Sequence, residues 1–313
     1  MSEHVAIVGG GAIGLLVAAH LASGGVRVTV LCRTEEQVQA IRTSGIVVER
    51  LGNGRPLAAA VEAASFNACE REGVRTPWAI LCVKAADVAA ILQAWPPGLG
   101  SEAVVALQNG LSAARELLQV LGPARALAGV TRLGANRVGP ARVREGGHGD
   151  TLIGPLDPQG TERAVRMAEL LAAAGLEARM LPDARAALWW KAAINTAINP
   201  LTAVLGIANG ELLMRTEWHW LMRAALVEAI DAALVDGVTL EAASLWNDVL
   251  DTLRRTGANR SSMLVDVEAG RPTELDAITG EILAAADRRG LRAHANHALY
   301  HLVRARTETR DPR

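Results

Sequence analysis

The sequence predicts an α/β Rossmann domain with a mostly parallel, doubly wound sheet, followed by an all-α helical domain. Three observations lead to this prediction. A glycine-rich turn follows a short apolar run near the start of the chain, apolar runs and helical periodicity alternate through the first half, and helical periodicity dominates after Pro182. A length of 313 residues suits two domains, which we expect at residues 1–182 and 183–313.

The first half alternates strands with helices. The expected strands are continuous apolar runs, which are typical of strands buried on both faces, and this alternation predicts a parallel sheet with helices on both sides. The strands are expected at Val5–Val8, Val26–Cys32, Trp78–Val83 and Ala103–Leu107, and the helices at Ala12–Ser23, Glu35–Ser44, Ala86–Ala94 and Ser112–Val120.

The segment Ala126–Ile153 is rich in Gly, Arg and Val, and predicts a few antiparallel strands on the sheet edge. A helix at Glu162–Ala174 and a strand at Leu176–Met180 complete the first domain. In the second domain we expect Pro200 to end the first helix, because proline lacks the backbone N–H. The second domain's helices are expected at Ala184–Ile198, Trp218–Asp236, Leu240–Arg255, Asp276–Arg289 and His294–Arg306.

Composition excludes several classes of protein. Lys and Arg total 32 and Asp and Glu total 33, so the formal net charge is −1, and neither nucleic acid nor a membrane is expected as a partner. Cys32, Cys69 and Cys82 form no C-x-x-C pair, which favours a reducing cytoplasm. The sequence leaves the oligomeric state open, a homodimer included.

The glycine-rich turn predicts a dinucleotide site. Gly9-Gly10-Gly11-Ala12-Ile13-Gly14 fits G-x-G-x-x-G between an expected strand and an expected helix. Gly9 permits the tight turn, Gly11 lets a pyrophosphate approach the backbone, and Gly14 lets the helix pack closely on the strand. The N–H groups that start the helix bind phosphate. The alternative is a plain strand–turn–helix with chance glycines.

Arg33 indicates which dinucleotide binds. It lies at the end of the second expected strand, nineteen positions after Gly14, where an acidic residue would hold the ribose 2′-hydroxyl of NAD. A guanidinium there favours a 2′-phosphate instead, so we expect NADPH. The alternative is an ordinary surface arginine in an arginine-rich chain.

The chain contains only two lysines, Lys84 and Lys191. Lysine offers a compact ammonium that can donate a proton, which arginine cannot. Lys84 follows a strand at the edge of the sheet where ligands bind. Lys191, Asn195 and Asn199 form an i, i+4, i+8 row on one helix face, which suits a small oxygen-rich anion. The alternative for this row is a solvated polar face.

His294, His297 and His301 lie at i, i+3, i+7 near the end of the chain. Neither a carboxylate nor a cysteine completes a ligand set, so we interpret them as a solvated face and expect no metal. The sole tyrosine, Tyr300, is not followed four residues later by lysine, which excludes Tyr-x-x-x-Lys chemistry.

The chain carries an ordered set of motifs along its whole length, and by these it resembles the ketopantoate reductase (2-dehydropantoate 2-reductase) family. This resemblance implies an NADPH-dependent enzyme of pantothenate synthesis, with a site in the cleft between a Rossmann and a helical domain. Besides the glycine motif, the set comprises Val83-Lys84-Ala85, Leu107-Gln108-Asn109-Gly110, residues 191–203 (KAAINTAINPLTA), Asn209-Gly210-Glu211-Leu212, residues 261–266 (SSMLVD) and Thr273-Glu274-Leu275-Asp276.

The resemblance also implies roles for single residues. Lys191 matches the general acid that protonates the ketone oxygen as hydride arrives from NADPH. The substrate pocket is matched by Asn195, Asn199, Asn209 and Ser262 with the segment Asn259–Ser262. On the cofactor side, Lys84, Asn109 and Glu274 match residues that contact NADPH, and Asn109 also touches the substrate.

Three functions remain open from the sequence. The first is reduction of ketopantoate to (R)-pantoate. The second is reduction of another branched 2-oxo acid, or of an imine as in opine-type dehydrogenases. The third is a protein that binds NADP as a sensor without catalysing a reaction; such a protein would not need Lys191.

Overall fold

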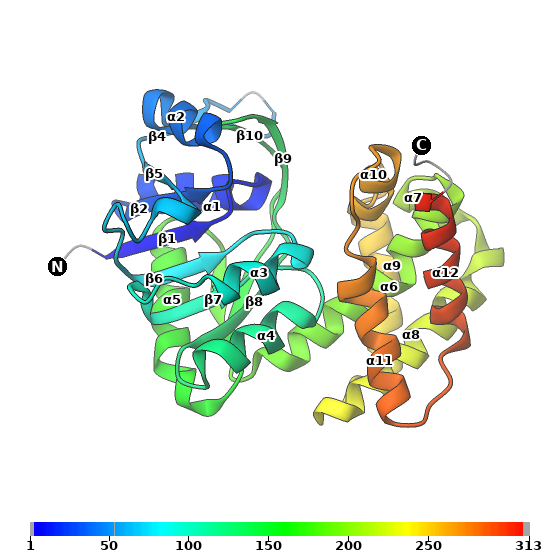
Figure 1. The fold of residues 1–313 in the computed structure, drawn as a ribbon. Helices are drawn as coiled ribbons and strands as arrows, with labels where there is room; N and C mark the ends of the chain where they lie inside the picture. Colours follow the sequence, from blue (N-terminus) through cyan, green and yellow to red (C-terminus); the bar gives the residue numbers. More distant parts are fainter. Residues whose placement is uncertain (1–2, 53, 309–313) are drawn as a thin grey trace. The chain divides into compact units, whose positions relative to one another are not determined.

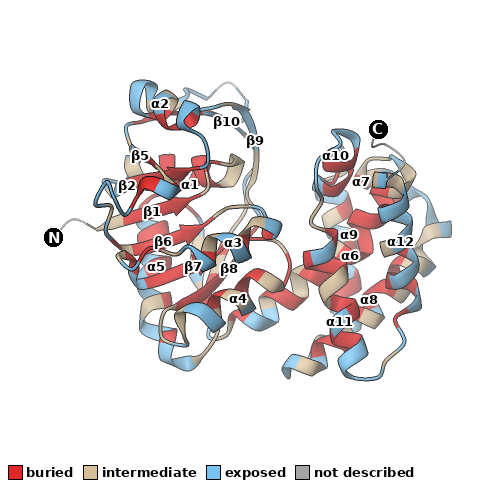
Figure 2. Cartoon of the chain, in the orientation of Figure 1, coloured by how far each residue is buried: buried red, intermediate tan, exposed pale blue. Residues whose placement is uncertain are grey.

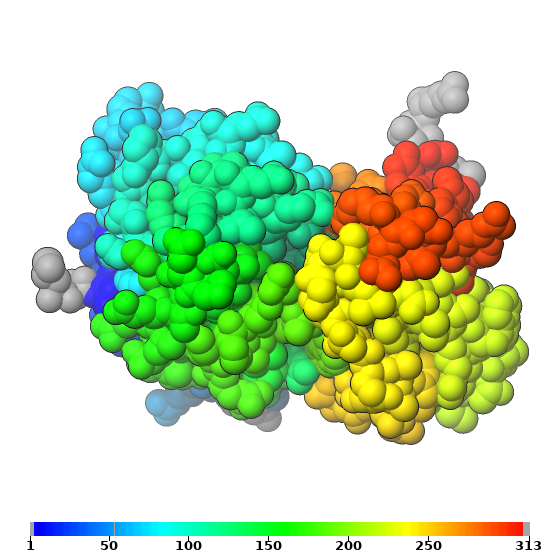
Figure 3. All heavy atoms as spheres, turned by 90° about the horizontal axis from the view of Figure 1, so that it is seen from below, coloured from blue at the N-terminus to red at the C-terminus, as the bar shows by residue number. Residues whose placement is uncertain are grey.

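A computed structural model describes residues 3–52 and 54–308 of the chain (Figure 1). The chain forms two compact units, one of Met1–Gln108 with Ala113–Ala184, the other of Asn109–Ser112 with Arg185–Arg313. The second unit therefore begins within two residues of the boundary expected between residues 182 and 183. The segment Asn109–Ser112 departs from that expectation, because its contacts group it with the second unit. Figure 3 shows all heavy atoms in the same colours.

The described part of the first unit contains an eight-stranded sheet in the order β12-β11-β8-β7-β6-β1-β2-β5. Neighbouring strands are parallel except β8 and β11, which are antiparallel. This confirms the predicted, mostly parallel sheet. Its strands are β1 (His4–Val8), β2 (Arg27–Cys32), β5 (Glu62–Ser65), β6 (Thr76–Leu81), β7 (Leu99–Ala106), β8 (Ala126–Thr131), β11 (Thr151–Pro155) and β12 (Ala178–Met180).

Alternate residues of the strands face two separate apolar layers. Val5 and Ile7 of β1 pack in a core with α1 (Ala12–Ser23), α2 (Glu35–Ser44) and α5 (Thr161–Ala173), whereas Ala6 and Val8 pack in a core with α3 (Val88–Gln93) and α4 (Ser112–Leu121). Side chains alternate along a strand, so β1 is buried from both sides. Figure 2 shows the resulting buried sheet, and the predicted doubly wound arrangement is confirmed.

The expectation of antiparallel edge strands throughout Ala126–Ile153 is partly wrong. β8 lies inside the sheet parallel to β7, because all of its residues are apolar or small and buried. The next two strands form an antiparallel hairpin that pairs with β3 in a separate four-stranded sheet within the described residues. This second sheet comprises β3 (Ile46–Glu49), β4 (Leu57–Ala59), β9 (Gly134–Gly139) and β10 (Arg142–Gly147).

The second unit is helical, as predicted. Two of its helices, α7 and α10, were not predicted from the sequence. They are too short for a helical pattern of apolar residues to repeat. In the described residues no helix is long and apolar enough to cross a membrane. The α-helices are α6 (Ala184–Leu205), α7 (Asn209–Met214), α8 (His219–Ala233), α9 (Ala242–Arg255), α10 (Ser262–Glu268), α11 (Glu281–Arg288) and α12 (His294–Glu308).

The expectation that Pro200 ends the first of these helices is wrong. α6 continues past it to Leu205. Proline removes one backbone hydrogen bond, but the residues beyond it, Leu201 and Ala203, are buried in the unit's core. The hydroxyl of Thr202 donates a hydrogen bond back to the helix at the carbonyl of Asn199, 2.9 Å away. Apolar burial therefore extends the helix through the proline.

A buried polar network ties α6 to its neighbours. Thr196 on α6 donates a hydrogen bond to Asn296 on α12 (2.7 Å) and is bonded to the hydroxyl of Thr279 (2.9 Å). The Asn296 amide donates to Glu228 on α8 at 2.8 Å and to the Ala225 carbonyl at 2.9 Å. Thr196, Thr279 and Asn296 are fully buried, so each polar atom depends on these partners.

We predict that Asn296→Ala lowers the free energy of unfolding by roughly 2–3 kcal/mol, because it removes the side-chain partner of the buried Thr196 hydroxyl and of the Ala225 carbonyl. Chemical denaturation followed by circular dichroism measures the change. The matched control is Asn247→Ala, at an exposed position of α9, for which less than about 0.5 kcal/mol is expected. Equal losses in the two variants would contradict the role given to the network.

Candidate functional site

The glycine turn between β1 and α1 has a backbone that other residues would not fit. Gly9 has a φ of 115°, and a Cβ there would lie 2.9 Å from the backbone carbon of Cys82. A Cβ on Gly14 would lie 2.0 Å from the carbonyl oxygen of Gly9. The helix therefore approaches the turn closely, as the motif predicts. The Cys82 thiol beside this turn is no thiolate at neutral pH, since burial raises its pKa to about 12.

Gly11 differs from these two glycines, because no neighbouring atom of the protein excludes a side chain at this position. A Cβ there would meet only the Cys82 carbonyl oxygen, at an ordinary 3.8 Å. Gly11 is also the N-cap of α1, and within the described residues no side chain caps the helix and no acid lies in its first turn. The backbone N–H groups at this end, together with the helix dipole, fit a phosphate group, and a side chain at Gly11 would fill the space beside them.

Gln37 on α2 holds the turn from one side. It is buried, and its amide nitrogen donates hydrogen bonds to the carbonyls of Gly10 (2.7 Å) and Pro140 (2.8 Å). A Cβ on Gly10 would lie 2.6 Å from this amide. Gln37 thus fixes the position of the glycine turn, a role that the glycine motif did not indicate.

Arg33 and Lys84 lie at the carboxyl ends of β2 and β6, the strands on either side of β1. Both side chains are at exposed positions. The Arg33 guanidinium forms an ion pair with Asp87 over a 2.5 Å N–O distance. Because ligands bind at the carboxyl edge of such sheets, these cations lie where a dinucleotide is expected.

The second unit carries the predicted lysine and amide row. Lys191, Asn195 and Asn199 follow one another at four-residue intervals on α6, the first two partly buried and Asn199 9% exposed. Four-residue spacing places their side chains on one helix face. The row therefore presents one ammonium and two amides along a single line.

Asn209 begins α7 near the segment Asn259–Ser262. Its side-chain nitrogen donates to the hydroxyl of Thr256 (2.9 Å), and its backbone N–H donates to the carbonyl of Asn259 (2.9 Å). Its side-chain oxygen is buried and has no hydrogen-bond partner in the described part of the chain. Such an atom is costly to bury unless a ligand or water satisfies it, so it fits a ligand-binding role.

The two serines that begin α10 have different environments. Ser261 is buried and caps the helix, accepting a hydrogen bond from the Leu264 N–H at 3.1 Å, and its hydroxyl is bonded to the hydroxyl of Thr202 at 2.7 Å. Ser262 and Asn259 are exposed. Of the two hydroxyls, only that of Ser262 is therefore at a position accessible to a substrate.

Asn109 and Glu274 are brought together within the second unit. The Asn109 amide donates to the Glu274 carboxylate at 2.8 Å. Just beyond Glu274, residues Asp276–Gly280 form a π-helical turn, in which the Glu281 N–H bonds the Asp276 carbonyl. The carbonyl of Ala277 instead accepts the N–H of Leu111 at 3.1 Å. The π turn thus attaches the segment that carries Asn109.

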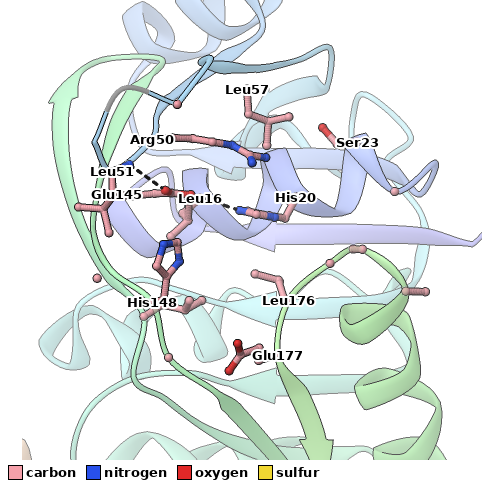
Figure 4. Close-up of a pocket in the computed structure, with 18 residues that line it drawn as sticks. Leu16, His20, Ser23, Arg50, Leu51, Leu57, Glu145, His148, Leu176 and Glu177 are labelled. Carbon is pink, nitrogen blue, oxygen red and sulfur yellow. Dashed lines mark hydrogen bonds and ion pairs between the residues drawn. The ribbon is translucent and has the colours of Figure 1, made fainter.

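A cavity of about 720 Å³ in the first unit lies against the second half of α1 (Figure 4). Its buried carboxylate, Glu145, accepts the N–H of Leu51 at 3.2 Å and lies 3.7 Å from the His20 ring. Burial lowers the pKa of His20. None of the predicted site residues lines this cavity. It therefore does not contribute to the candidate site.

The three histidines of the last helix occupy exposed positions, and the rings of His297 and His301 stack with centroids 6.0 Å apart. In residues 3–52 and 54–308, no group of three or more His, Cys, Asp or Glu side chains is arranged to hold a metal ion.

Comparisons with known proteins agree with these features. The family model described as ketopantoate reductase PanE/ApbA matches residues 5–158, and its C-terminal counterpart matches residues 183–307. A 2-dehydropantoate 2-reductase from Archaeoglobus fulgidus is 31% identical over 302 residues, which cover 96% of this chain and 97% of that protein. The chain belongs to the ketopantoate reductase family.

Other relatives extend this result. A 2-dehydropantoate 2-reductase from Vibrio cholerae is 30% identical over 96% of this chain and 97% of its own length. The crystal structure of a ketopantoate reductase from Ralstonia eutropha superposes with a TM-score of 0.84 at 29% identity, covering 98% of this chain and 99% of that one. The complex of D-mandelate dehydrogenase with NADH and anilino(oxo)acetate has a TM-score of 0.90 at 24% identity over 98% of this chain and 99% of that one, and shares the fold.

Within this ketopantoate reductase fold, the predicted residues form two groups, each described within its own unit. The first unit contains the glycine turn, Arg33 and Lys84. The second contains the remaining predicted residues, which are Asn109, Lys191, Asn195, Asn199, Asn209, Asn259, Ser262 and Glu274. Sequence reasoning missed Gln37 and Asp87, because nothing in their type or spacing connects them with the glycine motif or Arg33.

We predict that Gly110→Ala destabilises the chain more than Gly237→Ala does. Both glycines have positive φ, 93° and 70°, so each substitution incurs the left-handed backbone cost of about 1–2 kcal/mol. A Cβ on Gly110 would also lie 2.2 Å from the Ala277 carbonyl oxygen, whereas one on Gly237 meets nothing within 4 Å. Breaking the Leu111–Ala277 bond adds roughly 1–3 kcal/mol. Thermal and urea unfolding measure the difference, and equal effects would contradict the attachment.

Proposed function

We propose that this protein reduces 2-dehydropantoate (ketopantoate) to (R)-pantoate with NADPH, a step of pantothenate and coenzyme A biosynthesis. The observation that carries the proposal is the row of Lys191, Asn195 and Asn199 on α6 in a chain with only two lysines. Membership of the ketopantoate reductase family supports the choice of substrate.

Reduction of a ketone requires a hydride at the carbon and a proton at the oxygen. NADPH, when bound, supplies the hydride. Lys191 supplies the proton: an N–H bond of its ammonium breaks, an O–H bond forms on the former ketone oxygen, and the neutral amine regains a proton from water. A lysine ammonium can give up a proton near neutral pH when its surroundings favour the amine, and a guanidinium cannot.

The amides and the hydroxyl hold the substrate, which carries a carboxylate, a ketone and a hydroxyl. Asn195 and Asn199 lie on the same helix face as Lys191, so they align the ketone with its proton donor. The carboxylate and hydroxyl are assigned to Asn209, Asn259 and Ser262, of which Asn209 has a buried oxygen that needs a donor. A substrate hydroxyl is such a donor.

Cofactor binding is assigned to residues of both units. The glycine turn holds the pyrophosphate through backbone N–H groups, and Arg33 and Lys84 supply cations at the same sheet edge. Asn109 and Glu274, joined by their hydrogen bond, are assigned to the nicotinamide side. A preference for NADPH over NADH follows from the charge of Arg33.

A panel of 2-oxo acids tests the substrate. We expect ketopantoate to give the highest kcat/KM when oxidation of NADPH is followed by absorbance. Turnover of other branched 2-oxo acids, or of imines formed from a 2-oxo acid and an amine, without turnover of ketopantoate would reject the proposed substrate. NADPH binding without turnover of any of them would favour a sensor.

We predict that Lys191→Ala lowers kcat by about 10²–10⁴-fold, which is the usual contribution of a positioned general acid. Lys191→Arg is expected to be nearly as damaging, because arginine keeps the charge and cannot release the proton. The NADPH dissociation constant, measured by fluorescence, serves as the control and should change less than about threefold in both variants. Nearly full activity of Lys191→Arg would mean that charge, and not proton donation, is required.

A further inference from the structure

The ion pair between Arg33 and Asp87 joins the two sides of the glycine turn. Arg33 directly follows β2, and Asp87 ends the 3₁₀ turn Ala85–Asp87 that follows β6. Both strands pair with β1, β2 on one side and β6 on the other. The pair therefore connects the carboxyl ends of the two strands that flank the phosphate-binding turn, and it lies entirely within the first unit.

This ion pair joins two types of residue, an acid and an arginine, that favour different dinucleotides. An acidic residue near the end of the second strand favours the ribose 2′-hydroxyl of NAD, and an arginine nearby favours the 2′-phosphate of NADP. Here the arginine follows the second strand, and an acid from the other flanking strand is paired with it at 2.5 Å. The sequence does not indicate this acid, because it is 54 residues away along the chain.

A capping hydrogen bond does not account for the acid at Asp87. This residue precedes α3, yet in the described residues its side chain makes no capping hydrogen bond to that helix. Arg33 and Asp87 expose 76% and 39% of their side chains, so the pair adds little to folding stability and opens readily. A ligand with a stronger negative charge can therefore take the guanidinium from the carboxylate.

We propose that Asp87 is a specificity-determining residue that competes with the 2′-phosphate for Arg33 and lowers the preference for NADPH over NADH. The proposal rests on the nucleotide site of the proposed function. When the 2′-phosphate binds, Arg33 exchanges one oxygen ligand for another, and the Asp87 carboxylate is left beside a group of like charge. With a ribose 2′-hydroxyl neither cost arises, because the carboxylate can accept its hydrogen bond.

The test uses two nucleotides that differ only in the 2′-phosphate, namely 2′,5′-ADP and 5′-AMP. Their dissociation constants are measured by calorimetry on the full chain and on Asp87→Asn, without a 2-oxo acid. We expect Asp87→Asn to bind 2′,5′-ADP about three- to tenfold more tightly and to change 5′-AMP binding less than twofold, as removal of a close like charge predicts. Arg33→Gln should weaken 2′,5′-ADP alone, which checks that Arg33 contacts the 2′-phosphate.

Glu36→Gln provides the matched control. Glu36 is an exposed carboxylate in the first turn of α2, three residues from Arg33, and no ion pair links it to that arginine in the structure of residues 3–52 and 54–308. If Glu36→Gln raises the affinity for 2′,5′-ADP as much as Asp87→Asn does, the effect comes from the loss of any nearby negative charge and not from the contact with Arg33, and the inference is wrong.

The remaining outcomes separate this inference from the proposed function. Unchanged or weaker 2′,5′-ADP binding by Asp87→Asn overturns the competition, even if ketopantoate is reduced. Tighter binding by Asp87→Asn supports it, even if the substrate is a different 2-oxo acid. Failure of the unmodified chain to bind either nucleotide overturns both the nucleotide site and the inference.

Discussion

The close approach of α1 to the glycine turn is the constraint on which the nucleotide half of this protein depends. The helix starts so near the end of β1 that only hydrogen fits at position 14, against the Gly9 carbonyl. This approach aims the first N–H groups of α1 at the sheet's carboxyl edge, where the arginine and lysine side chains are attached. The buried amide of Gln37 fixes the turn from outside, through bonds to Gly10 and to the Pro140 carbonyl. The phosphate site is thus made by backbone, and side chains hold it in position.

In the second unit the corresponding constraint is the orientation of α6. A helix that bears its functional groups on one face is useful only if it cannot rotate about its axis. Thr196 prevents rotation from the buried side, since its hydroxyl is engaged by Asn296 and Thr279. Leu201 and Ala203, buried beyond Pro200, hold the far end. Such support keeps the reactive groups in a fixed geometry, and a small displacement of those groups costs much of the rate.

Much of the fold could be predicted because the relevant signals are local. Glycine spacing and hydrophobic periodicity placed α1 and α2 at the residues where they occur. The errors arose where tertiary contacts override local preference. Pro200 signals a helix end, but burial of the residues beyond it continues the helix. Strands β3, β4 and β5 have at most four residues each, too few to show a period.

The candidate site follows the same division. Residues within one motif, such as the row on α6, could be predicted from spacing. Asp87 could not, because four strands and the helix α2 separate it in sequence from its partner Arg33. The sequence also did not indicate that Ser261 is buried and Ser262 exposed. Two neighbouring serines have the same chemistry, and only the backbone conformation decides which side chain faces the interior.

Because of the π turn at Asp276–Gly280, the number of residues in this segment matters as much as which residues they are. A π turn amounts to one extra residue within a helix. Loss of that residue would restore the regular register and return the Ala277 carbonyl to an intrahelical partner. Everything before the deletion would turn by about 100°, the angle of one helical residue, and would carry Glu274 away from Asn109. A relative one residue shorter at this point would need another way to hold these two side chains together, even with every site residue retained.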